Sequence, residues 1–145
     1  MEGVLAQAEG NYAVAVETLR TAKGLSRARF LAGGYISDLP VYLETLALAL
    51  LEKGDLEAAE QEFQEIVSLA GDRLYWPWIW LGAHVHLAEL AARDRRPDDA
   101  RRHAAVVGRY WGGAGGHQQP LVDDLLERLS RIIPGEASGA ATPGR

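Results

Sequence analysis

Hydrophobic residues recur at spacings of three and four along most of the first 133 residues, and alternation of period two is not sustained anywhere. The clearest segment is 56–70, LEAAEQEFQEIVSLA, in which positions 56, 59, 63, 66, 67 and 70 are apolar. This spacing places the apolar side chains on one face of an α-helix. The opposite face carries Glu57, Glu60, Glu62 and Glu65. The pattern predicts an all-α fold.

A short pattern recurs three times in this helical part of the chain. In the first two copies, glycine and then Asn or Asp precede an apolar residue, an alanine three positions further on, and a large apolar residue four beyond that. Glycine allows the left-handed turn that ends one helix. The side chain of Asn or Asp caps the next helix by accepting hydrogen bonds from its free backbone N–H groups. The pattern therefore predicts helix–turn–helix hairpins. The matched residues are Gly10/Gly54, Asn11/Asp55, Tyr12/Leu56, Ala15/Ala59 and Leu19/Phe63, and Arg95, Arg96, Pro97 and Ala100 take the corresponding places in the third copy.

These hairpins resemble the tetratricopeptide repeat, a helix–turn–helix unit of about 34 residues that stacks into a right-handed solenoid. The resemblance covers most of the first 111 residues, with repeats at about 1–29, 40–73 and 81–111. It is weaker in the third repeat, where His84 and Ala104 stand at positions that usually hold large apolar residues. In the second repeat the packing positions are Leu43, Leu46, Ala47 and Leu50 in the first helix, and Ala59, Phe63 and Ile66 in the second.

The spacing of the copies is longer than the family period of about 34 residues. Successive copies lie 44 residues apart (Gly10 to Gly54) and 41 residues apart (Gly54 to Arg95). In family register the extra residues fall at 30–39 and 74–80, two apolar and aromatic inserts that each precede a first helix. Counting back from the first turn, the first helix of the first repeat would begin before the first residue. The chain is therefore expected to be either a piece of a longer protein or a protein with a shortened first helix.

The segment 120–133, PLVDDLLERLSRII, predicts one more amphipathic helix. Leu121, Leu125 and Leu129, with Ile132 or Ile133, form an apolar stripe opposite charged residues. A helix of this kind is expected to cap the open end of a solenoid, which gives a helical repeat domain over 1–133. Residues 134–145 are rich in Gly, Pro, Ala and Ser and predict a disordered tail. The succession of Arg-Tyr-Trp, polar turn, Pro-Leu and Arg-Leu also resembles the end of tetratricopeptide regions attached to bacterial Ser/Thr protein kinases and related signalling proteins.

Composition narrows the functional classes. The 145-residue chain has no cysteine, so disulfides and thiolate metal sites are excluded, and its net charge is −5, which argues against general nucleic-acid binding. The acidic start MEGVLAQAE is unlike a signal peptide, and no stretch approaches the ~20 apolar residues that span a bilayer. We therefore expect a cytoplasmic protein that binds neither nucleic acid nor membrane. Thirteen Arg against two Lys hint at a GC-rich bacterial genome.

The sequence contains no cluster that predicts catalysis, a metal site or a cofactor. His84 and His86 point about 200° apart on a helix, so one ion cannot use both. His86 and Glu89 could share a face, with His103 on the partner helix, but we favour a packed His84 and a partly solvated His86. The serines lie in no nucleophile-elbow context. The run GGAGG at 112–116 lacks the Lys-Ser/Thr of a phosphate loop and is interpreted as a flexible turn.

Three tryptophans lie within the stretch YWPWIW, residues 75–80. Pro77 suits the first turn of a helix that we expect to run to about Arg93. Trp80 would share the packing stripe of that helix with His84 and Leu87, and Trp76 would pack against the insert 30–39. Trp78 lies on another stripe, with Gly82, Val85 and Glu89. The family resemblance implies that this stripe faces a concave groove, to which the second repeat would contribute Val41, Glu44, Leu48 and Leu51.

We therefore predict a module for protein–protein interaction, without catalysis, that binds an apolar or basic segment of a partner in the groove. The proposed binding residues are Trp78, Val85, Glu89, Glu44, Leu48 and Trp76. The alternatives are a regulatory or sensor segment of a larger bacterial signalling enzyme, such as a protein kinase or transcriptional regulator, and a small-molecule pocket lined by the tryptophans. Among the charges, Glu62 or Glu65 is expected to pair with Arg101 or Arg102. The alternative is that the arginines form a basic patch for an acidic partner. The oligomeric state stays open.

Overall fold

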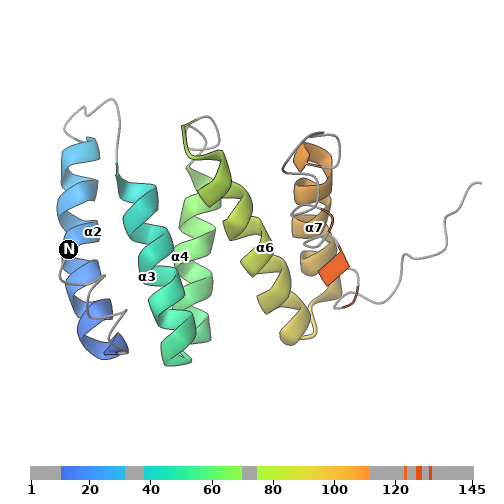
Figure 1. The fold of residues 1–145 in the computed structure, drawn as a ribbon, viewed down its shortest axis with the longest axis horizontal. Helices are drawn as coiled ribbons and strands as arrows, with labels where there is room; N and C mark the ends of the chain where they lie inside the picture. The colour runs from blue at the N-terminus through green and yellow to red at the C-terminus, as the bar shows by residue number, and fades with distance from the viewer. Residues whose placement is uncertain are drawn as a thin grey trace, which may run out of the picture. The chain divides into compact units, whose positions relative to one another are not determined.

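The computed structural model describes residues 11–31, 38–69 and 75–111, together with Asp123, Glu127, Arg128 and Arg131. These residues form α-helices joined by turns, and no strand occurs among them, which confirms the predicted all-α class for this part of the chain (Figure 1). The helices are α2 (Tyr12–Leu31), α3 (Leu39–Lys53), α4 (Leu56–Ser68), α6 (Pro77–Arg93) and α7 (Pro97–Trp111). None of these helices is both long enough and apolar enough to cross a membrane.

The chain divides into two compact units, Met1–Ala83 and His84–Arg145, and the division falls inside α6. The first unit contains α2, α3, α4 and the first seven residues of α6, and the second contains the rest of α6 and α7. Several predicted segments lie outside the described residues: the first helix of the first repeat, most of the insert 30–39, the glycine-rich turn 112–116, most of the segment 120–133, and the tail 134–145.

In the first unit, α3 packs against both α2 and α4 (Figure 1). The apolar stripe predicted for the second repeat forms this core, and each of its members is completely buried. They are Leu43, Leu46, Ala47 and Leu50 of α3 and Ala59, Phe63 and Ile66 of α4. From α2, Ala15, Val16 and Leu19 are buried as well. Three-and-four spacing therefore identified the core-facing side of these helices correctly.

The turn between α3 and α4 follows the predicted glycine mechanism. Gly54 takes a left-handed conformation with φ of 85° and donates its N–H to the carbonyl of Leu51, 3.0 Å away. The next N–H, that of Asp55, bonds to the carbonyl of Leu50 at 2.9 Å. The two bonds satisfy carbonyl groups that the helix end would otherwise leave without partners.

The turn between α6 and α7 repeats this arrangement without glycine. Arg95 has a φ of 59°, and its backbone N–H donates to the carbonyl of Ala92 at 3.1 Å. The backbone N–H of Arg96 donates to the carbonyl of Ala91 at 2.8 Å. Each atom of this pattern lies 41 residues after its counterpart in the α3–α4 turn. The predicted equivalence of Gly54 and Arg95 is thus confirmed in backbone geometry. Arginine in a left-handed conformation carries a steric cost that glycine avoids.

The two predicted polar caps behave differently. Asn11 accepts a hydrogen bond from the backbone N–H of Val14, at 3.4 Å from its side-chain oxygen, as the capping prediction requires. Asp55 makes no side-chain hydrogen bond to the start of α4, so this part of the prediction is wrong. Its carboxylate lies 3.9 Å from the ammonium of Lys53 and so faces the preceding helix.

The α6–α7 hairpin begins each of its helices at a proline, Pro77 and Pro97, and α6 ends at Arg93, as predicted. Proline suits a first turn because the N–H that it lacks has no helical partner there. Within the second unit, α6 buries a run of apolar residues and α7 buries Ala100 and Val107. The buried residues of α6 in this unit are His84, Val85, Leu87, Ala88, Leu90 and Ala91.

Candidate interaction surface

Four of the six predicted binding residues belong to the first unit. Glu44 and Leu48 lie on α3, and both are partly exposed. Trp76 immediately precedes α6 and is partly exposed, while Trp78, in the first turn of α6, is 49 % exposed. Together with Gly82 of α6, these residues are here named the α3–α6 face.

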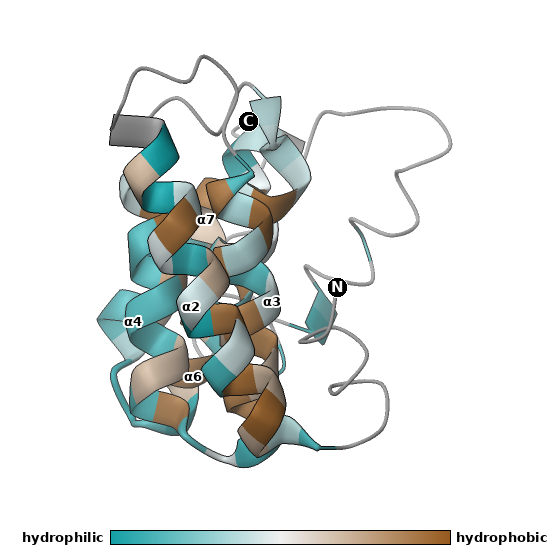
Figure 2. Ribbon diagram, turned by 90° about the vertical axis from the view of Figure 1, so that its left-hand side faces the viewer, coloured by the Kyte–Doolittle hydropathy of each residue, from teal (hydrophilic) through white to brown (hydrophobic). Residues whose placement is uncertain are grey.

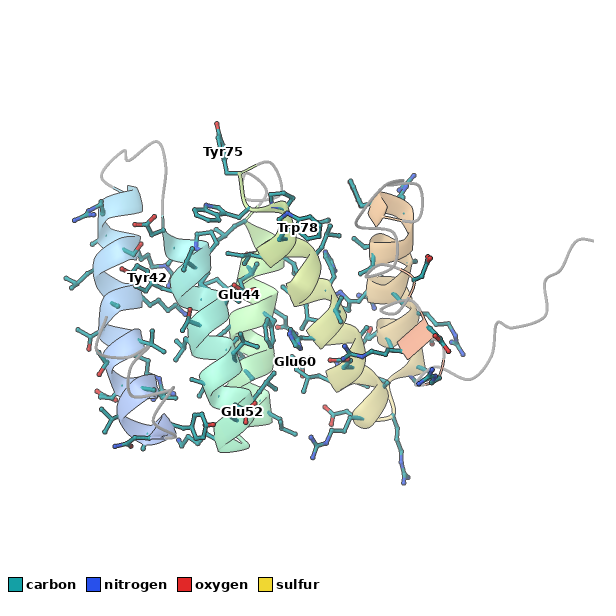
Figure 3. The ribbon with its side chains drawn as sticks, viewed as in Figure 1. Tyr42, Glu44, Glu52, Glu60, Tyr75 and Trp78 are labelled. Atoms are coloured by element: carbon teal, nitrogen blue, oxygen red, sulfur yellow. The ribbon has the colours of Figure 1, made fainter. Side chains whose placement is uncertain are left out.

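One contact shows that α3 and the start of α6 approach each other at this face. A Cβ atom added to Gly82 would lie 3.8 Å from Oε1 of Glu44, with no other heavy atom of a described neighbour as near. The carboxylate of Glu44 therefore lies beside the glycine backbone, where a larger side chain would occupy the space in front of it. Figure 3 shows Glu44 on α3 and Trp78 at the start of the neighbouring α6.

Trp78 lies one helical turn before Gly82, so both residues are on the same side of α6. A half-exposed indole and a carboxylate are thus held on adjacent helices on either side of a position without a side chain. An indole face attracts cations, and a carboxylate binds guanidinium or ammonium groups by charge-assisted hydrogen bonds. The chemistry of this face suits a basic side chain that also carries an apolar stem.

The other two predicted residues, Val85 and Glu89, lie in the second unit. Val85 was expected to face a partner, but it is only 6 % exposed. The prediction assigned it to the exposed stripe because it lies one turn after Gly82. The second unit instead uses this position for packing, since Val85 belongs to the buried run on α6.

Glu89 is held by the second unit itself. Its Oε1 accepts from Nη2 of Arg128 at 2.5 Å, and its Oε2 lies 3.4 Å from Nδ1 of His86. The hydrogen bond from His86 lowers the pKa of Glu89, burial opposes this effect, and the positive charge of Arg128 adds to it, so the pKa lies below its usual value. Glu89 thus serves to join α6 to the segment containing Arg128, a contact that sequence spacing did not predict.

The outcome for the tryptophans is mixed. Trp80, expected in the core, is only partly buried, whereas Ile79 and Leu81 on either side of it are buried. The first half of α6 is apolar on nearly every side, so periodicity does not identify its inner face. The expected contact of Trp76 with the insert 30–39 lies outside the described residues.

His84 is 7 % exposed, which agrees with its predicted role in packing. Its Nδ1 lies 2.8 Å from Nδ1 of His103 on α7, and the two ring centroids are 5.1 Å apart. A hydrogen bond between these atoms requires one ring to donate and the other to accept, so the two rings cannot both be protonated in this arrangement. Burial, and secondly the charge of His103, lowers the pKa of His84 to about 4. No group of three or more metal-binding side chains occurs among the described residues.

The charged residues pair differently from the prediction. Nζ of Lys23 on α2 lies 2.6 Å from Glu62 and 2.8 Å from Glu65, and Arg27 lies 2.8 Å from Glu65. The predicted partners of these glutamates, Arg101 and Arg102, bind Asp98 and Asp99 of their own helix. These ion pairs of Glu62 and Glu65 join α4 to α2.

The surroundings of Lys23 also affect its ionisation. Burial opposes the charged form, but hydrogen bonds to Glu62 and Glu65 outweigh it, and the pKa of Lys23 is raised.

Comparison of the chain with protein-family models, with curated proteins and with solved structures finds no match in any of the three. The resemblance to tetratricopeptide repeats therefore depends on the residues and the turn geometry described above.

Proposed function

We propose that this chain is a protein-interaction module of the tetratricopeptide type, and that its α3–α6 face binds a peptide or helical segment of a partner protein. The observation that carries the proposal is the carboxylate of Glu44 beside Gly82, with the half-exposed ring of Trp78 one helical turn away. The proposed role is that of a cytoplasmic scaffold without catalytic chemistry.

The chemistry of the face defines the segment it would take. Leu48 and Trp78 provide apolar surface, and Glu44 provides a negative charge in a partly buried position. A segment with a lysine or arginine next to an apolar residue would satisfy both features. The net charge of −5 favours encounter with basic partners over acidic ones.

The proposal is tested by affinity capture from the native cell with the full chain and two variants, followed by identification of the bound proteins. Trp78→Ala is expected to weaken the binding of a specific partner at least tenfold, because tryptophan residues often dominate the binding energy of an interface. Glu44→Gln is expected to weaken the binding of the same partner. The effect should be larger at low ionic strength, where salt screens the charge of Glu44 less.

The matched control is Tyr110→Ala in α7, since Tyr110 is an aromatic residue of similar exposure at 52 %. It should leave the partner bound. Unchanged capture by both Trp78→Ala and Glu44→Gln, at unchanged melting temperature, would exclude the α3–α6 face as the binding site.

A further inference from the structure

The outward side of α2 differs from that of α4 in the residues that it exposes. Most of the exposed residues of α2 share this side, and six of them, which include two large apolar side chains, Val14 at 50 % and Leu25 at 71 % exposure, are considered together. The opposite side of α2 packs into the unit through Ala15, Val16 and Leu19. The six residues, here named the outer α2 face, are Val14, Glu17, Arg20, Thr21, Gly24 and Leu25. In Figure 1 α2 lies to the left of α3, against which it packs, and Figure 2 shows α2 from that side.

Two of the smaller residues of the outer α2 face, Thr21 and Gly24, leave room for contact with another helix. The hydroxyl of Thr21 donates to the carbonyl of Glu17 within the same helix, at 3.2 Å, so its hydrogen bond is already made. A Cβ at Gly24 would meet nothing within 4 Å, which leaves open space for the close approach of another helix. By contrast, the exposed residues of α4 are polar or charged: Glu57, Gln61, Gln64 and Ser68. The outer α2 face thus combines exposed apolar residues with space for a close neighbour, as interaction surfaces do.

The outer α2 face also carries two charged side chains, Glu17 and Arg20. Within the described residues, neither Glu17 nor Arg20 forms an ion pair, although Lys23 and Arg27 of the same helix are both bound by α4. One face therefore presents an anion and a cation together, and such a face can be complementary to itself.

A single register satisfies both the apolar and the charged residues. If two α2 helices lie antiparallel about a two-fold axis between Leu19 and Arg20, Val14 of one copy stands directly opposite Leu25 of the other. In the same register Arg20 of one copy lies opposite Leu19 of the other, two residues from Glu17 of that copy. This offset is about 3 Å along the helix axis, so the side chains of Arg20 and Glu17 can reach each other. Two-fold symmetry makes each of these contacts twice.

We propose that two copies of this chain associate through the outer α2 face, with the helices antiparallel in this register. A face of this size is at the small end of specific interfaces, so we expect a dissociation constant in the micromolar range, on the order of 10 μM. The proposal uses residues distinct from the α3–α6 face and is independent of the proposed function.

The test is sedimentation velocity of the full chain from low to high micromolar concentration. The mass of the wild-type chain is expected to rise with concentration from 15.8 kDa towards twice that value. Leu25→Glu places a charge directly opposite Val14 of the other copy and should keep the chain monomeric, or weaken association more than tenfold. Gln61→Glu, which adds the same charge to the exposed side of α4, should behave as wild type. Circular dichroism and the melting temperature should be unchanged, because Leu25 is largely exposed.

The register is tested separately by charge exchange. E17R places two cations opposite each other and should weaken association several-fold, and E17R combined with R20E should restore it because opposite charges face each other again. A wild-type chain that stays monomeric throughout, or a Leu25→Glu variant that associates like wild type, would overturn the proposed dimer. Failure of the exchanged pair to restore association, with Leu25→Glu monomeric, would overturn the antiparallel register.

Discussion

The α3–α4 and α6–α7 hairpins have the same turn geometry but different side chains at equivalent positions. At an offset of 41 residues, Leu43 corresponds to His84 and Phe63 to Ala104. The first hairpin fills these positions with completely buried apolar groups, while the second has an imidazole that faces His103 and an alanine that is only partly buried. The backbone pattern of a hairpin therefore tolerates exchange of its large core residues, and this exchange changes which interactions stabilise the hairpin.

The largest expected effect comes from giving the first hairpin the smaller core residue of the second. Phe63→Ala should lower the free energy of unfolding by about 3–5 kcal/mol, because it leaves a cavity where a completely buried ring packs. Chemical denaturation followed by circular dichroism measures the change. Gln61→Ala, on the exposed side of α4, is the control and should change stability by less than about 0.5 kcal/mol. A loss of under 1 kcal/mol for Phe63→Ala would contradict the role of Phe63 in the core.

The second hairpin should be selectively sensitive to acid. His84 has a pKa of about 4 in the folded chain and an ordinary value near 6.5 when unfolded, so the unfolded state takes up the proton first. The contribution of neutral His84 to stability is therefore complete above about pH 6.5 and is lost as the pH falls towards 4. One pKa unit corresponds to about 1.4 kcal/mol, so the loss of stability is at most about 3–4 kcal/mol, and partial solvent screening reduces it to roughly 2 kcal/mol.

The control for this prediction is His84→Leu, which places the residue of the first hairpin in the second. The difference in unfolding free energy between pH 7 and pH 4.5 should be smaller in this variant than in the wild type. Carboxylates titrate in both chains, so the comparison isolates the imidazole. Equal pH dependence in the two chains would show that His84 does not titrate with a lowered pKa.

The first unit should instead be sensitive to alkali. The pKa of Lys23 is raised in the folded chain. The ion pairs of Lys23 therefore stabilise the fold fully below about pH 10.4, and this stabilisation is lost as the pH rises through the pKa that Lys23 has in the folded chain. Lys23→Met is expected to cost about 1–2 kcal/mol at neutral pH, because it leaves Glu62 and Glu65 close together without the shared cation. Thermal unfolding at pH 8 and pH 11 measures both effects. If the variant matched the wild type at pH 8, the α2–α4 ion pairs would have no role in stability.

The smallest expected effect concerns the turns. Arg95→Gly gives the second turn the residue of the first and should raise the free energy of unfolding by about 0.5–1 kcal/mol, since it removes the steric cost of a left-handed arginine. Gly54→Ala makes the opposite change and should lower it by about 1 kcal/mol. Melting temperatures of the two variants should therefore shift in opposite directions. A destabilised Arg95→Gly chain would mean that the arginine side chain contributes more than its backbone strain costs.

Local features of the fold could be predicted because they depend on residues near one another in the chain. The starts of α6 and α7 at Pro77 and Pro97, the left-handed Gly54, and the buried stripe around Leu43 and Phe63 agree with the structure. The candidate site was less predictable. Glu44 and Trp78 are on the same unit and exposed to different degrees, but Val85 is buried and Glu89 is bound by Arg128.

The sequence by itself determined the helices, their turns and most of the core, because periodicity, glycine and proline act within one or two helical turns. Only the tertiary structure decided which charges meet, with Glu62 and Glu65 bound by Lys23 and Arg27 of α2, and it alone decided that His84 meets His103. These outcomes depend on distances between helices, and many pairings of opposite charges fit the same sequence equally well. Burial of Val85 has the same cause, since an apolar residue on a helix that is apolar on most sides is buried wherever a neighbour covers it.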